Sequence, residues 1–74
     1  MKKYDSASIE LEADNRATAI SRKYPGNHLS EAARRAGMSI GEDDTWYTAA
    51  KYMAVQELKR EIPTEYHPAW FRRY

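Results

Sequence analysis

The sequence predicts a small, mainly α-helical domain of three to four helices around a central helix at about residues 40–62. Residues 42–61 form a long run without glycine or proline, and they contain the densest group of apolar side chains. Most of them favour helix, and the run begins with acidic side chains and ends near Lys59 and Arg60, which suits the helix dipole. A chain of this length makes one domain, so we expect a single small domain over residues 1–74.

Two local signals predict the ends of the central helix. Residues 39–42 fit the S-x-x-E capping box, which starts the helix near Ile40, and the two aspartates that follow are equally suitable N-caps. Pro63 ends the helix, because the residue before a proline disfavours helical backbone. The first half of the helix is apolar nearly all round, so it requires cover on every side. Tyr52 and Val55 are the positions that we expect to face a partner.

The N-terminal segment has two interpretations, and the first is a β-strand at about residues 5–13. Apolar and polar side chains alternate there with a period of two, which is typical of a half-buried strand. Asp14 would then be the N-cap of a helix over residues 15–23. This interpretation gives an α+β variant of the fold.

The second interpretation is one long helix from about residue 6 to residue 24. Ile9 and Ala13 begin a series of apolar residues at helical spacing, and Glu12 and Arg16 would form an ion pair four residues apart. The local pattern slightly favours the strand. The rest of the chain offers little sheet to pair with a strand, so the mainly α class is preferred and α+β is the alternative.

The middle of the chain contains a turn and a short helix. Tyr24–Asn27 has the proline and glycine of a turn. Residues 29–37 then form a second helix, with Ser30 as its N-cap and Gly37 in the left-handed conformation after its end. After the central helix, residues 64–68 are expected to be a loop.

Composition limits the classes of function. The chain has no cysteine, so it has no disulfide and no thiolate metal site, and its net charge of +1 does not indicate a nucleic-acid partner. No apolar run is long enough for a membrane span and no signal peptide is present, which predicts a cytoplasmic protein without membrane contact. A domain this small buries little surface, so a homodimer or another partner is expected.

No motif for catalysis or cofactor binding is present in the sequence. His28 and His67 have no second ligand at metal-site spacing, and the chain has neither a nucleophile motif nor a phosphate-binding loop. We therefore predict a protein that is not an enzyme, with no catalytic residue, no metal and no cofactor.

The aromatic and basic content instead indicates a protein partner. Six Tyr, two Trp and one Phe accompany few Leu and Val, and Tyr, Trp and Arg are the side chains enriched at binding hot spots. The candidate partner-binding residues are Tyr52, Val55, Trp70, Phe71, Arg72, Arg73 and Tyr74. Residues 69–74 are expected to form a short helix or strand, and Trp70 and Phe71 have the alternative of packing back as core.

The leading hypothesis is a small regulator or inhibitor that acts by protein–protein binding. By size and type alone, a phage or mobile-element protein that blocks a host factor, such as an anti-CRISPR protein, fits this profile. Residues 31–39, E-A-A-R-R-A-G-M-S, resemble the first helix and turn of helix-turn-helix DNA-binding domains, which implies a transcriptional regulator as the alternative. The acidic residues Glu42, Asp43 and Asp44 depart from that pattern, because they would repel DNA phosphates.

Overall fold

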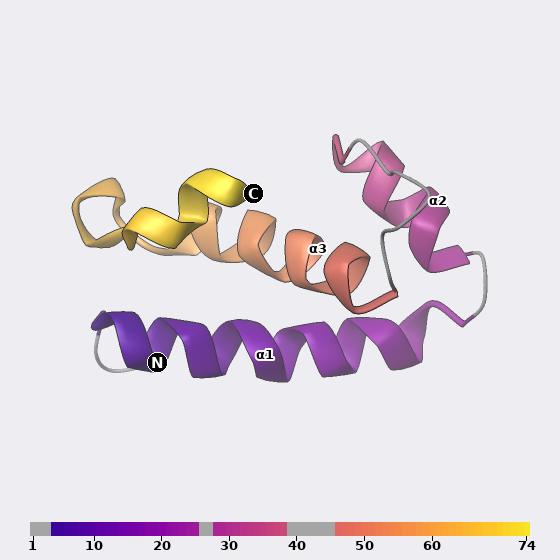
Figure 1. The fold of residues 1–74 in the computed structure, drawn as a ribbon, viewed down its shortest axis with the longest axis horizontal. Helices are drawn as coiled ribbons and strands as arrows, with labels where there is room; N and C mark the ends of the chain where they lie inside the picture. Colours follow the sequence, from indigo (N-terminus) through magenta and orange to yellow (C-terminus); the bar gives the residue numbers. More distant parts are fainter. Residues whose placement is uncertain (1–3, 26–27, 39–45) are drawn as a thin grey trace.

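The computed structural model describes residues 4–25, 28–38 and 46–74, and most of these residues are helical (Figure 1). The elements in chain order are α1 (Ser6–Lys23), α2 (His28–Arg35), α3 (Trp46–Glu61) and two 3₁₀-helices, η1 (Thr64–Tyr66) and η2 (Ala69–Arg73). Helices α1 and α3 lie side by side and antiparallel, α2 packs against the start of α3, and η1 and η2 fold back along its other end. The predicted mainly α class is confirmed.

The alternative of a strand at residues 5–13 is wrong, because α1 begins at Ser6. Asp5 is the N-cap: its carboxylate accepts a hydrogen bond from the Ser8 main-chain N–H at 2.7 Å and another from the Ser8 hydroxyl at 3.1 Å. Asp14 is therefore not an N-cap and lies within the helix. Apolar side chains at helical spacing along α1 are buried against α3, whereas no strand lies in the described residues to pair with this segment.

The start of α2 also differs from the prediction. The helix begins at His28, so Ser30 lies inside it and is not the N-cap. The main-chain N–H of His28 donates to the carbonyl of Pro25 at 3.3 Å, and the helix begins three residues earlier than an N-cap at Ser30 would place it.

The end of α2 is confirmed at Gly37, which has a φ of 106°. Its N–H donates to the carbonyl of Arg34 at 3.0 Å, and the N–H of Met38 donates to the carbonyl of Ala33 at 3.0 Å. These two bonds form a Schellman motif, which satisfies carbonyls that a helix end leaves unpaired. A Cβ atom at Gly37 would lie 3.2 Å from the hydroxyl of Tyr52, so both the backbone and the packing favour glycine here.

The central helix ends as predicted, since α3 stops at Glu61 shortly before Pro63. The N–H of Ile62 still donates to the carbonyl of Leu58 at 2.8 Å, and Pro63 cannot continue this pattern. The predicted start near Ile40 and the predicted caps fall in residues 39–45, which lie outside the described residues.

The core consists of two clusters, and α3 contributes to both. The cluster at the α2 end contains Ala17, Ile20, Leu29, Ala33, Ala49, Ala50 and Ala54. The cluster at the C-terminal end contains Ile9, Ala13, Val55, Leu58, Ile62 and Phe71. Alanine predominates in the first cluster and larger side chains in the second. As predicted, α3 is the central helix that the other elements cover.

Candidate functional site

The C-terminal segment, residues 63–74, turns back along α3 and places new side chains beside its last turn. Pro63 and Pro68 each stand directly before a 3₁₀-helix, where their fixed φ suits the start of a turn. Phe71 anchors the segment, because its side chain is only 2% exposed and packs with Val55 and Leu58. The side chain of Gln56 also donates a hydrogen bond to the main-chain oxygen of Tyr74.

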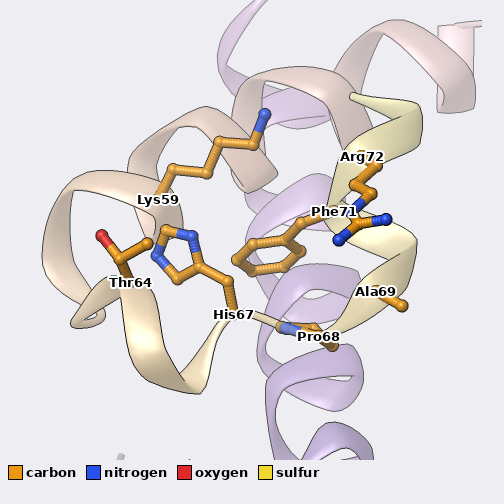
Figure 2. Close-up of a pocket in the computed structure, with 7 residues that line it drawn as sticks. All are labelled: Lys59, Thr64, His67, Pro68, Ala69, Phe71 and Arg72. Atoms are coloured by element: carbon orange, nitrogen blue, oxygen red, sulfur yellow. The ribbon is translucent and has the colours of Figure 1, made fainter.

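A surface pocket of about 420 Å³ lies between the last turn of α3 and the two 3₁₀-helices (Figure 2). Its lining residues are Lys59, Thr64, His67, Pro68, Ala69, Phe71 and Arg72. The volume falls within the range of about 300–1,000 Å³ that ligand sites occupy. Its floor is apolar and its rim is polar, so it can hold a group that combines both characters.

The ring of His67 is fixed at one wall of this pocket. Its Nε2 lies 2.8 Å from the carbonyl oxygen of Ile62, and a carbonyl only accepts, so Nε2 carries the proton and donates. The ring centroid lies 5.1 Å from that of Phe71, with the two planes tilted by 59°. In the neutral ring Nδ1 is therefore the nitrogen that can accept a further hydrogen bond.

The rim of the pocket is positively charged. Figure 2 shows Lys59, from the last turn of α3, and Arg72, from η2, on either side of Phe71. No carboxylate lines the pocket, and within the described ranges neither cation forms an ion pair. Within the part of the chain that the structure describes, the pocket therefore presents two charges without a carboxylate partner.

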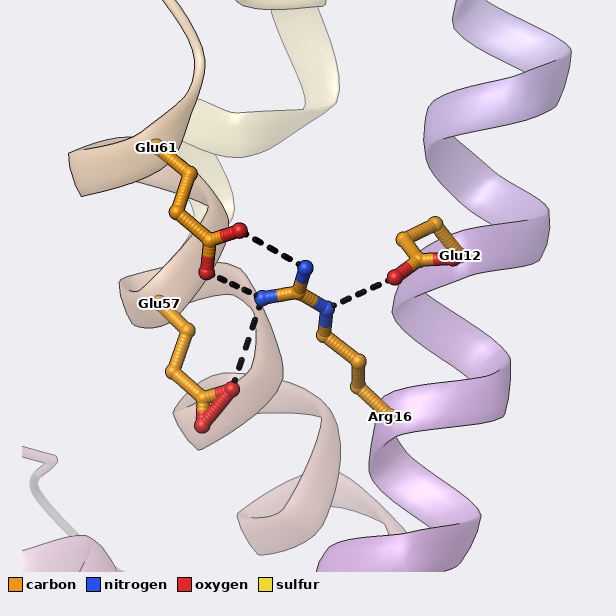
Figure 3. Close-up of polar contacts among 4 residues, drawn as sticks. All are labelled: Glu12, Arg16, Glu57 and Glu61. Carbon is orange, nitrogen blue, oxygen red and sulfur yellow. Dashed lines mark hydrogen bonds and ion pairs between the residues drawn. The ribbon is translucent and has the colours of Figure 1, made fainter. Parts of the chain in front are cut away.

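Arg16, by contrast, is fully neutralised at the interface between α1 and α3 (Figure 3). Its Nε donates to Glu12 at 2.9 Å, which confirms the ion pair predicted four residues apart. Its two terminal nitrogens donate to the two oxygens of Glu61, and Glu57 lies 3.5 Å away. The hydrogen bond from Arg16 lowers the pKa of Glu61, and the same bond together with that to Glu12 raises the pKa of Arg16. This network holds α1 to α3.

Lys51 is a second neutralised cation, and its residue is 8% exposed. Its Nζ lies 2.5 Å from Oδ1 of Asp14, which also accepts from the Tyr47 hydroxyl at 2.5 Å. The hydrogen bond from Lys51, and then that from Tyr47, lowers the pKa of Asp14. Burial has the largest single effect and would lower the pKa of Lys51, but the hydrogen bond to Asp14 and the nearby charges, chiefly that of Asp14, together raise it. Nζ also lies 5.4 Å from the ring centroid of Trp70.

Two of the predicted partner-binding residues lie in the core. Val55 has no exposed surface and Phe71 has almost none, because the C-terminal segment closes over α3 at these positions. Tyr52 is half-buried, and its hydroxyl lies 3.4 Å from the carbonyl of Ala36 at the end of α2. This placement does not support the prediction that Tyr52 and Val55 face a partner. Phe71 packs in the core, which was the alternative predicted for it.

The other four predicted residues lie at or near the surface. Trp70 and Tyr74 are half-buried, with their rings edge to face at 6.3 Å between centroids. Nε1 of Trp70 is buried and has no hydrogen-bond partner in the part of the chain that the structure describes. Arg72 and Arg73 are exposed, but only Arg72 lines the pocket. The sequence did not predict that Lys59 and Arg72 would line the same pocket. They come together only because the C-terminal segment turns back along α3.

An exposed aromatic pair lies at the same end of the molecule. Tyr4, before α1, and Tyr66, in η1, are 39% and 47% exposed. Their ring centroids are 5.0 Å apart. The pair therefore offers a preformed aromatic surface, and its member Tyr66 lies on η1, which also supplies Thr64 to the pocket wall.

Comparison with known proteins finds no family model, no curated sequence and no solved structure that matches this chain. Across residues 4–25, 28–38 and 46–74, no three His, Asp or Glu side chains are grouped so that they could hold a metal ion. In the same ranges no helix has both the length and the apolar character needed to cross a membrane. The site is therefore interpreted from its geometry alone.

Proposed function

We propose that this protein is a non-enzymatic regulator or inhibitor that acts by binding another protein through the end of the molecule formed by its C-terminal segment. The observation that carries the proposal is the combination of two cations that form no ion pair among the described residues, Lys59 and Arg72, with an exposed pair of aromatic rings, Tyr4 and Tyr66. Aromatic and arginine side chains supply much of the binding energy at protein interfaces.

The charges around this end of the molecule favour a protein over DNA. The first turns of α1 lie at the same end and carry exposed carboxylates, Asp5 and Glu10. A duplex would meet these carboxylates as well as the cations, and DNA affinity depends mainly on neutralising several phosphates. A protein surface of mixed charge can match both signs, which suits a chain whose net charge is +1.

The test is capture of a partner by purified, tagged protein from a lysate of the cells that express it. We expect wild type to retain a specific protein, Tyr66→Ala to lose it, and Leu11→Ala to keep it. Leu11 is 63% exposed on α1 and is the matched control for loss of an exposed large side chain. Thermal melts should stay the same, since both residues contribute little to the core.

A salt titration separates this proposal from DNA binding. Capture through aromatic anchors and two cations should weaken far less between 50 and 200 mM salt than DNA binding with several phosphate contacts, which weakens by about 10³ or more. A strong, salt-sensitive shift of duplex DNA, together with equal capture of proteins by wild type and Tyr66→Ala, would refute the proposal.

A further inference from the structure

We infer that the pocket lined by Lys59, His67 and Arg72 binds a carboxylate side chain of the partner, presented by an acidic segment that also carries an apolar or aromatic residue. This inference rests on the proposed function, since it names the chemistry of the protein partner. It concerns the pocket, and not the Tyr4–Tyr66 pair.

The first argument is charge. Each ion pair among the described residues involves Arg16 or Lys51, and both cations are satisfied by carboxylates of α1 and α3. Lys59 and Arg72 come from separate elements, line one pocket and lack such partners in the same part of the chain. A carboxylate between them would receive the fork of the guanidinium and the ammonium group together, which gives strong charge-assisted hydrogen bonds.

The second argument is the shape and rigidity of the pocket. Phe71 forms the floor and is held in the core, and the hydrogen bond to Ile62 fixes the ring of His67. The site therefore needs little ordering when it binds, which lowers the entropic cost of association. Pro68 and Ala69 extend the apolar wall. A residue next to the carboxylate that has an apolar side chain can pack against this wall.

The probe is the peptide acetyl-Phe-Glu-Glu-Leu-amide, added to uniformly ¹⁵N-labelled protein and followed by two-dimensional NMR. We expect saturable shifts of the amide signals of residues 64–72. The peptide with both Glu replaced by Gln should bind at least about tenfold more weakly, the factor expected when a hydrogen bond between charged groups is lost. Inorganic phosphate and a 12-base-pair duplex are added in separate titrations.

The matched pair of variants is Arg72→Gln and Arg73→Gln. Both remove one exposed positive charge from η2, but only Arg72 lines the pocket. We expect Arg72→Gln to weaken binding of the Glu peptide about tenfold. Arg73→Gln should change the affinity less than about twofold, because an exposed charge outside the site is screened by salt.

The inference is overturned by any of three results: equal binding of the Glu and Gln peptides, equal losses in the two variants, or tighter binding of the duplex than of the Glu peptide at the same amide signals. Absence of any shift at 10 mM peptide also overturns it. Failure of the inference is distinct from failure of the proposed function. If Arg72→Gln captures the cellular partner as wild type does, while Tyr66→Ala does not, the function stands and the pocket is not its carboxylate site.

Discussion

The ion pair between Lys51 and Asp14 predicts that removing one partner destabilises the protein more than removing the other. The side chain of Lys51 is 10% exposed, whereas the side chain of its partner Asp14 is 44% exposed. Asp14→Asn removes the negative charge and leaves the ammonium group buried, whereas Lys51→Met leaves Asp14 in contact with water. The first substitution should therefore destabilise the protein considerably more than the second.

The magnitudes follow from burial. Breaking a fully buried ion pair costs about 3–5 kcal/mol. The exposure of Asp14 and the hydrogen bond that an asparagine oxygen can still accept reduce this, so we expect Asp14→Asn to cost about 2 kcal/mol. In Lys51→Met an apolar side chain of similar length takes the place beside Trp70, and the change should stay within about 1 kcal/mol. In the Lys51→Met background, Asp14→Asn should then cost less than about 0.5 kcal/mol.

The assay is urea unfolding followed by circular dichroism, with thermal melts as a second measurement. For a domain of this size, a loss of 2 kcal/mol corresponds to a fall of roughly 8–16 °C in Tm. The double variant completes a thermodynamic cycle that isolates the pair. Equal losses for the two single variants, or additive losses in the double variant, would show that Lys51 does not depend on Asp14 and would refute this account of the cluster.

Three further predictions concern the fold. Phe71→Ala should cost about 3–5 kcal/mol in urea unfolding, since it empties a buried site, and a loss below about 1 kcal/mol would show that the C-terminal segment does not complete the core. Gly37→Ala should cost about 1–2 kcal/mol because of the positive φ and the nearby Tyr52 hydroxyl; an unchanged midpoint would contradict the Schellman geometry. The pKa values of Asp14 and Glu61 are lowered, so their contribution is complete above the ordinary carboxyl pKa of about 4 and is lost as the pH falls through the folded values. Melts from pH 6 to pH 2 should show this loss, and Asp14→Asn should reduce it; an acid limb of equal depth in the variant would exclude Asp14 as a source.

The features that could be predicted from the sequence depend on neighbours along the chain. Gly37 after a helical run and Pro63 after another mark helix ends, because the backbone preferences of these residues act locally. The choice between strand and helix at residues 5–13 could not be made in this way. Alternating and helical spacing both fit that segment, and its burial against α3 decides the outcome.

The candidate site was harder to predict because its parts are distant in sequence. The pattern of α3 alone predicts that Val55 faces a partner, because the C-terminal segment that covers this residue comes many residues later in the sequence. The sequence does contain one signal that separates the two neutralised cations from the others. Ten of the twelve basic residues occur as adjacent pairs, and the two that stand alone are Arg16 and Lys51. These two are the cations that form the ion pairs of the described structure.

The division of the core into two clusters has a consequence for how the chain can vary. The clusters share helices α1 and α3 but no buried side chain, since one contains residues such as Leu29 and the other residues such as Phe71. Substitutions in separate clusters should therefore have additive effects on stability. The sequence of the alanine-rich cluster at the α2 end can then vary while the end that carries the pocket keeps its geometry. Sequence change at the α2 end would therefore leave the proposed binding surface at the other end intact.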